Sequence, residues 1–152
     1  MTLPNPKTDM SNLATYEAGL LQARAYRTLN RAFSAYLASV SLSLSEWALL
    51  GLLRIHGRMT HVELASELDV TPTMATKLVT RLEASGYLDR VADSGDNRVK
   101  FVEIAAAGNK LIDQIEPHLR RRMARLMSGV EQPNLVAYLG VLAYLADSSN
   151  ET

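Results

Sequence analysis

Hydrophobic positions recur with a helical period at the N-terminal end of the chain. From about residue 9 to residue 38, apolar residues are spaced by three, four or their sums, and charged residues lie between them. The polar segment 39–45 interrupts this pattern. A second helix is predicted from Ser45 to a glycine stop at Gly57.

Two more helices are predicted at the other end, over residues 105–128 and 134–146, with Gly129 and Pro133 separating them. The last of these is apolar nearly all round. Because a helix of that kind must be buried on most sides, the pattern predicts either a core helix or a helix that is buried in a dimer.

Two short helices in the middle of the chain predict a helix-turn-helix. Thr60 and Glu63 form a capping box that opens the first helix. Thr71 caps the second, a proline occupies its first position, and Gly86 ends it. Apolar residues of the two helices are placed to share a small core: Leu64, Ala65, Leu68, Val70, Ala75, Leu78 and Val79.

Residues 87–91 and 99–104, YLDRV and VKFVEI, are rich in β-branched and aromatic residues and flank the polar segment ADSGDNR. This pattern predicts a hairpin with a long polar tip. A hairpin directly after a helix-turn-helix makes a winged helix. The predicted fold is therefore mainly α with a small β-hairpin wing, in which a winged helix-turn-helix over residues 45–104 is flanked by long N- and C-terminal helices.

The second helix of the motif turns short hydroxyls and a cation away from its apolar side. An α-helix fits the major groove of DNA, and residues near its N-terminus reach base edges. Thr71, Thr73 and Thr76 are placed to contact phosphates or bases. Lys77 is placed for a guanine edge or a phosphate, and Arg81 for the DNA backbone. Arg98 at the wing tip is suited to the minor groove, where the negative potential is enhanced. A solvated helix face is the alternative interpretation of the same stripe.

Composition limits the other classes of function. Sixteen basic and sixteen acidic residues cancel, so local placement alone must carry a prediction of nucleic-acid binding. The absence of cysteine excludes disulfides and thiolate metal sites, and the three histidines have no metal-binding spacing. The chain has no secretory h-region and no apolar run of the about 20 residues that span a membrane. We therefore expect a cytoplasmic protein with no membrane partner. Without a nucleotide-binding or catalytic motif, we expect neither enzymatic activity nor a cofactor.

The order and spacing of these motifs resemble the MarR-type (multiple antibiotic resistance regulator) transcription factors, and the resemblance covers nearly the whole chain. The residues that carry it are Glu63-Leu64-Ala65, Leu68, Val70-Thr71, Thr76-Lys77-Leu78-Val79, Arg81-Leu82-Glu83, Gly86-Tyr87-Leu88, Arg90 and Asp96-x-Arg98. The resemblance implies a homodimer whose dimerisation region comprises residues 9–40 and 105–146. It also implies a pseudo-palindromic operator and a repressor that is released by a small aromatic or phenolic ligand.

The resemblance assigns roles to single positions. It implies a set of DNA-binding residues that comprises Thr71, Thr73, Thr76 and Lys77 in the major groove, Arg81 and Arg90 on the backbone, Arg98 in the minor groove, and Asp96, which orients the wing. Trp47 and Tyr36, with Tyr16 and Tyr26, are candidates for an effector cavity between the long first helix and the winged domain. Core positions are the alternative for these aromatic residues.

Three features depart from the family pattern. Asn97 stands in the wing where an arginine is common, and Ala105 stands where a threonine often opens the next helix. Residues 71–100 hold five cations against four anions, a net charge of only +1, which predicts modest non-specific affinity for DNA. Two other classes of function therefore stay open. One is a winged-helix protein-interaction module that binds no DNA, and the other is a small ligand-binding or catalytic helical dimer.

Overall fold

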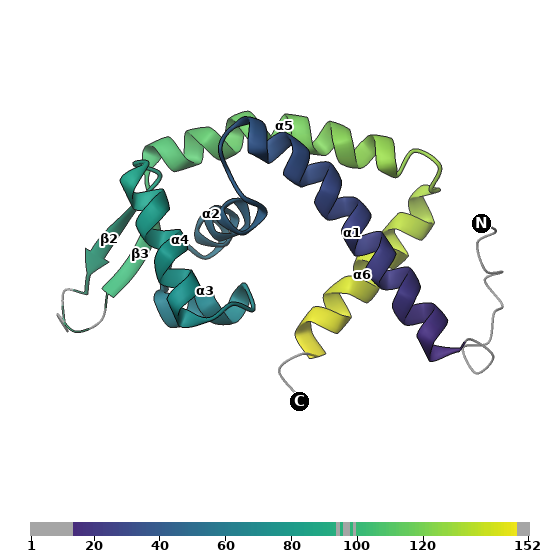
Figure 1. Ribbon diagram of the computed structural model, residues 1–152, viewed down its shortest axis with the longest axis horizontal. Coiled ribbons are helices and arrows are strands. Elements are labelled where there is room, and N and C mark those ends of the chain that lie inside the picture. The colour runs from purple at the N-terminus through teal and green to yellow at the C-terminus, as the bar shows by residue number, and fades with distance from the viewer. Residues whose placement is uncertain (1–13, 94, 96–97, 99, 149–152) are drawn as a thin grey trace. The chain divides into compact units, whose positions relative to one another are not determined.

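The computed structural model describes residues 14–93, 95, 98 and 100–148. Its elements, shown in Figure 1, are α1 (Thr15–Ser39), α2 (Leu44–His56), β1 (Arg58–Thr60), α3 (His61–Glu67), α4 (Pro72–Ala84), β2 (Leu88–Ala92), β3 (Lys100–Ile104), α5 (Ala106–Leu126) and α6 (Gln132–Ser148). A mainly helical chain with a small antiparallel sheet confirms the predicted fold class. Residues 9–13 of the predicted first helix, and Asp96 and Asn97 of the wing, lie outside the described residues.

The chain forms two compact units that divide between Leu119 and Arg120. The first unit contains α1 to α4, the sheet and the beginning of α5. The second contains the end of α5 and all of α6. The assignment of residues 9–40 and 105–146 to dimerisation stays a prediction.

Side-chain caps set the starts of α3 and α4, as predicted. The Thr60 hydroxyl accepts a hydrogen bond from the Glu63 amide at 3.2 Å, and the Glu63 carboxylate accepts one from the Thr60 amide at 2.7 Å. The backbone and hydroxyl donors of Thr60 lower the pKa of the Glu63 carboxyl. At α4, the Thr71 hydroxyl accepts from the Met74 amide at 3.2 Å. Both helices therefore begin where their capping residues predict.

The prediction that Ser45 opens the second helix is wrong, because the cap lies two residues earlier and α2 begins at Leu44. Ser43 is its N-cap: the Ser43 hydroxyl accepts from the Glu46 amide at 3.1 Å, and the Glu46 carboxylate accepts from the Ser43 amide at 2.7 Å. This is a second capping box, and it satisfies two backbone N–H groups that a cap at Ser45 would leave unpaired. Gly57 ends α2 with φ of +79°, a conformation that glycine adopts without strain.

The separation of the last two helices also differs from the prediction. Helix α6 begins at Gln132, so Pro133 lies inside its first turn and does not separate it from α5. The first turn tolerates proline because its N–H groups have no intrahelical partner.

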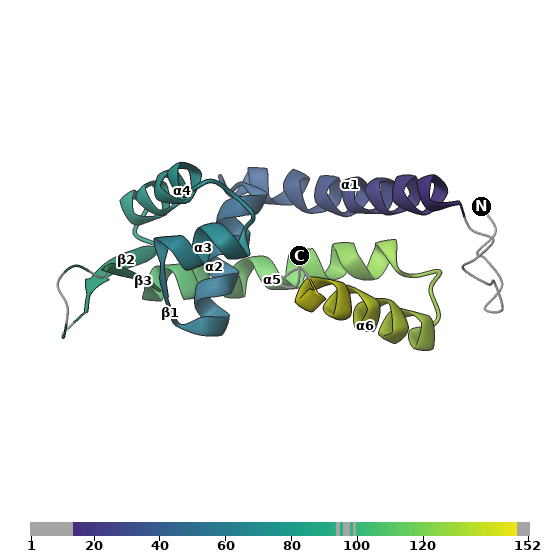
Figure 2. The ribbon, with the colours of Figure 1, turned by 90° about the horizontal axis from the view of Figure 1, so that it is seen from below.

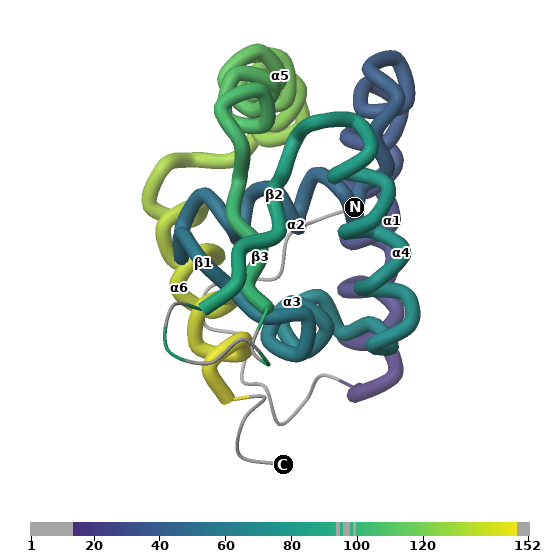
Figure 3. The backbone as a smooth tube through the Cα atoms, turned by 90° about the vertical axis from the view of Figure 1, so that its left-hand side faces the viewer, coloured from purple at the N-terminus to yellow at the C-terminus, as the bar shows by residue number. Residues whose placement is uncertain are grey.

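The sheet has one strand more than the predicted hairpin. Its order is β1-β3-β2, with both pairs antiparallel, and Figure 3 shows the three strands next to one another. The extra strand β1 pairs Arg58 with Glu103, and their side chains form an ion pair at 2.5 Å. The Arg58 guanidinium also lies 5.3 Å from the centre of the Phe101 ring. These contacts connect the segment before α3 to the base of the wing.

The core of the first unit gathers apolar side chains from α1 to α5 and from the sheet. Figure 2 shows α2, α3 and α4 beside the strands that complete it. Its buried members are Leu37, Leu42, Leu49, Leu50, Leu53, Met59, Leu64, Leu78, Val79, Leu82, Leu88, Val102, Ile115 and Leu119. Burial of Leu64, Leu78 and Val79 confirms the predicted small core between α3 and α4. This core fixes which face of α4 is left for other contacts.

Helix α6 has no buried residue among the described residues 132–148. Leu135 is half-buried, and the other large apolar side chains of this helix are exposed: Val136, Tyr138, Leu139, Val141, Leu142, Tyr144 and Leu145. Burial in a dimer stays a prediction.

Within the described residues, no single helix is long and apolar enough to span a bilayer. Helices α1 and α2 reach that length and composition only when they are taken together across a bend of 89°.

Candidate nucleic-acid interface

Helix α4 presents an exposed polar face opposite its buried one. Ala75, Leu78, Val79 and Leu82 are buried, whereas Thr73, Thr76, Lys77 and Thr80 are exposed. Helical periodicity separates these two sets completely. The stripe of hydroxyls with one cation in the middle therefore lies on the surface of the winged helix, as predicted.

Several of the threonine hydroxyls on this face are already bound within the protein. The Thr71 hydroxyl accepts from Met74 as the helix cap, and the Thr76 hydroxyl donates to the Pro72 carbonyl at 3.0 Å. The Thr80 hydroxyl accepts from Arg90 at 2.9 Å. A hydroxyl has one donor and two acceptor positions, so Thr71 retains its donor and Thr76 retains acceptor capacity for a ligand.

Arg90 lies between the wing and α4. Its Nε is 3.0 Å from Glu83 Oε2, and its Nη2 donates to Thr80. The guanidinium therefore ties strand β2 to α4. The family resemblance implies that Arg90 contacts the DNA backbone, and it did not predict these contacts with Glu83 and Thr80.

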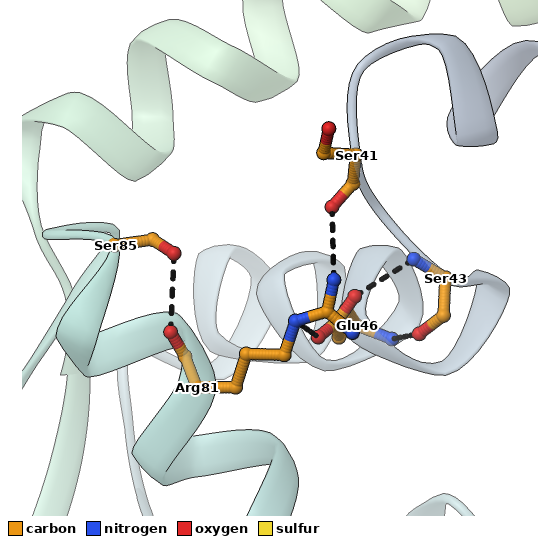
Figure 4. A network of polar contacts seen from close by, with 5 residues as sticks. All are labelled: Ser41, Ser43, Glu46, Arg81 and Ser85. Atoms are coloured by element: carbon orange, nitrogen blue, oxygen red, sulfur yellow. Dashed lines mark hydrogen bonds and ion pairs between the residues drawn. The ribbon is translucent and has the colours of Figure 1, made fainter.

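Arg81 makes two contacts with the segment at the start of α2, shown in Figure 4. Its Nε is 3.0 Å from Glu46 Oε1, and its Nη2 donates to the Ser41 carbonyl at 3.4 Å. The Glu46 side chain is 1% exposed and the Arg81 side chain 63%. Glu46 was missed as a functional candidate, although its spacing from Ser43 marks a cap.

The positive charges beside the wing act on His61 at the start of α3. Partial burial and the nearby Arg90 and Lys100 guanidinium and ammonium groups lower the pKa of His61, and Glu83 opposes this effect. Lys100 and Arg98 are both exposed on the wing. Asp96, the predicted residue that orients the wing, lies outside the described residues.

An open pocket of about 650 Å³ lies within the first unit, between α2 and the facing parts of α3 and α5. Its lining comprises Trp47, Ala48, Gly51, Leu52, Arg54, Ile55, Glu67, Leu68, Ile112, Asp113 and Glu116. Arg54 Nη1 lies 2.7 Å from Asp113 Oδ1 and joins α2 to α5. The pocket is mostly apolar with a few charged groups, as small-molecule sites commonly are.

The candidate effector residues are not brought together. Trp47 lines the pocket and packs edge-on against Phe33, with ring centres 5.8 Å apart. Tyr36 stacks on His118 at 4.7 Å and does not belong to the lining. Tyr16 and Tyr26 are 71% and 65% exposed.

Residues 42–100 match the sequence model of the MarR family. The chain is 26% identical over 136 residues to the HTH-type transcriptional regulator FarR of Neisseria gonorrhoeae, a match that covers 90% of this chain and 92% of FarR. It is 28% identical over 134 residues to the HTH-type transcriptional repressor NicR of Pseudomonas putida, covering 88% and 85% of the two chains. The crystal structure of NadR in complex with 4-hydroxyphenylacetate has a TM-score of 0.74 and 26% identity, and covers 93% of this chain and 98% of NadR.

Proposed function

Since the chain belongs to the MarR family, we propose that it is a transcriptional regulator that binds a pseudo-palindromic DNA operator as a homodimer. The observation that carries this proposal is the exposed polar face of α4 directly beside the wing. Operator binding at a promoter excludes polymerase, so we propose repression as the default outcome. This role requires no catalysis, and we place it in the cytoplasm, where the DNA is.

We propose that α4 enters the major groove with Thr73 and Lys77 at its centre. Both side chains are exposed, and both lie in the first half of the helix, the part that reaches base edges in helix-turn-helix proteins. The Thr71 hydroxyl can still donate a hydrogen bond to DNA, and the Thr76 hydroxyl can still accept one. Arg98 at the wing supplies the minor-groove cation.

Exposed apolar side chains support the dimer. In addition to α6, helix α1 exposes Tyr16, Leu20, Leu21 and Tyr26. Large apolar side chains exposed in such numbers on a helix favour a contact with another protein chain. We propose that α1, α5 and α6 form the interface between two copies of the chain and that it sets the spacing of the two α4 helices.

Operator binding tests the proposed function. Fluorescence anisotropy should show binding to a duplex from immediately upstream of the protein's own gene and weaker binding to an unrelated duplex, at near-physiological salt. Lys77→Ala and Arg98→Ala should each weaken operator binding by about 1–3 kcal/mol. Lys110→Ala is the matched charge control, because Lys110 is an exposed lysine outside the winged domain. Since it lies in α5, sedimentation velocity must show that this variant is still a dimer. A protein that binds neither duplex would favour the interaction-module alternative.

We further propose that the pocket beside Trp47 receives a small aromatic effector. The lining holds the carboxylates of Glu67, Asp113 and Glu116 against the guanidinium of Arg54. This charge balance favours an uncharged phenol over an aromatic carboxylate.

The single tryptophan of the chain makes effector binding measurable. Titration with 4-methylphenol should quench the emission of Trp47 and weaken operator binding by about 5–150-fold, the usual range for coupled sites. By calorimetry, Trp47→Ala should weaken phenol binding and Tyr36→Phe should leave it unchanged, because Tyr36 lies outside the lining. Tighter binding of 4-hydroxyphenylacetate than of 4-methylphenol would contradict the charge argument.

A further inference from the structure

Glu46 is a buried carboxylate whose cation comes from the recognition helix (Figure 4). Its side chain is 1% exposed, its Oε2 accepts from the Ser43 amide at 2.7 Å, and its Oε1 lies 3.0 Å from Arg81 Nε. A buried charge is tolerated only when it is paired and hydrogen-bonded. The capping box fixes this carboxylate at the start of α2, so Arg81 must reach back to it from α4.

The same guanidinium contacts the junction between α1 and α2. Arg81 Nη2 donates to the carbonyl of Ser41, a non-glycine residue with φ of +59° in the turn that joins the two helices. Three helices therefore meet at one side chain. Two of the directions in which the planar guanidinium can donate are fixed by these contacts.

Lys77 lies one helical turn before Arg81 on the same helix. Any rotation or shift of α4 that moves Lys77 therefore also moves Arg81 away from the carboxylate. The ion pair resists this movement, because separating the pair leaves a charge buried without its partner.

We propose that Glu46 is a positioning residue for DNA recognition: through Arg81 it holds α4 at a set orientation on the α1–α2 junction. Arg81 then acts as an internal tie and not as the DNA-backbone contact that the family resemblance implies. The inference rests on the proposed function, since it concerns how the DNA-reading helix is held.

The two roles of Arg81 differ in their salt dependence. A phosphate contact releases a counterion and contributes about 0.9 to the slope of log affinity against log salt. An internal tie contributes nothing to that slope, even when its loss weakens binding.

The experiment compares Glu46→Gln, Arg81→Gln and the double variant by operator anisotropy between about 50 and 200 mM salt. Glu46→Gln retains an amide oxygen for the Ser43 N–H and so preserves the capping box. Each single variant should lose about tenfold in operator affinity with an unchanged slope, as expected for a coupled pair in contact. The double variant should lose no more than either single one. Lys77→Gln serves as the control for a cation that faces the DNA, so its slope should fall while the slopes of the Glu46 and Arg81 variants stay unchanged.

Two results would overturn the proposal. One is a slope that falls by about one per protomer in Arg81→Gln while Glu46→Gln binds like the wild type. The other is full additivity in the double variant. Because the double variant removes both charges, it keeps the test valid where Arg81→Gln alone fails to fold.

Amide hydrogen exchange separates this proposal from the proposed function. Glu46→Gln should speed exchange in both segments that the ion pair joins, residues 40–46 and 76–84. Unchanged exchange in the α4 segment would overturn the tie whether or not the protein binds DNA. If the wild-type protein binds no duplex but Glu46→Gln still speeds exchange in α4, the proposed function is wrong. The proposed contact between Glu46 and Arg81 as a support for α4 is then still correct.

Discussion

Replacement of Gly108 with alanine is expected to lower the free energy of unfolding by about 3 kcal/mol, near the upper end of the range for overpacked sites. Gly108 is buried in the first turn of α5. A Cβ atom there would lie 2.1 Å from the Tyr87 carbonyl oxygen and 2.8 Å from Ile104 Cγ1. A carbonyl cannot rotate away as a side chain can, so the backbone itself must shift.

The shift would fall on the connection between the recognition helix and the wing. Tyr87 lies between α4 and β2, its carbonyl accepts from the Ala105 amide at 3.0 Å, and its own amide donates to the Leu82 carbonyl at 3.0 Å. Displacing Tyr87 strains both hydrogen bonds and moves the base of the wing. Operator affinity should therefore fall together with stability.

Urea denaturation at one fixed protein concentration measures this effect, because the stability of a dimer depends on concentration. Gly51→Ala is the matched control: it lies within helix α2, and its added Cβ would meet no atom within 4 Å. Alanine has the higher helix propensity, so this control should gain about 0.5–1 kcal/mol. A Gly108→Ala protein that unfolds at the wild-type midpoint would show that the first turn of α5 can move without cost.

The fold was predictable wherever the residues that start or end an element lie within one short stretch of sequence. Thr60 with Glu63, and Thr71 ahead of a proline, satisfy backbone donors locally, so they mark helix starts without any knowledge of the fold. Ser43 and Glu46 have the same spacing as Thr60 and Glu63, so this capping box was also visible in the sequence. The prediction placed the cap at Ser45, directly before the apolar run, and overlooked that spacing. Strand β1 has only three residues, and its pairing of Arg58 with Glu103 depends on contacts far apart along the chain.

The exposed face of the candidate site was also predictable from the local sequence, but its ion pairs were not. Helical periodicity identifies the exposed face with Thr73 and Lys77, because the buried face follows from apolar spacing alone. Which cations of the site are held by the protein itself does not follow from spacing. The pairing of Arg81 with Glu46 and that of Arg90 with Glu83 arise only when α2, α4 and the wing are packed.

Two charges on α6, introduced as Leu139→Asp and Leu142→Asp, are expected to abolish specific operator binding. In the chain alone these side chains are 55% and 43% exposed, in a helix with no buried residue among those described. If α6 is covered by a second copy, each carboxylate must lose its water at a cost of several kcal/mol. The dimer should therefore dissociate.

Loss of the dimer should weaken operator binding by about 10²–10⁴-fold, because two linked winged domains bind two half-sites at a high effective concentration. Sedimentation velocity measures the assembly, and anisotropy measures operator binding on the same samples. Asn134→Asp is the control for one added carboxylate, since it places a single charge at an exposed position in the first turn of α6, where the helix dipole favours it. Dimer dissociation and the loss of operator binding should occur together, because both depend on burial of α6. A folded monomer that keeps its operator affinity would contradict the proposed dimer and, with it, the proposed spacing of the two recognition helices.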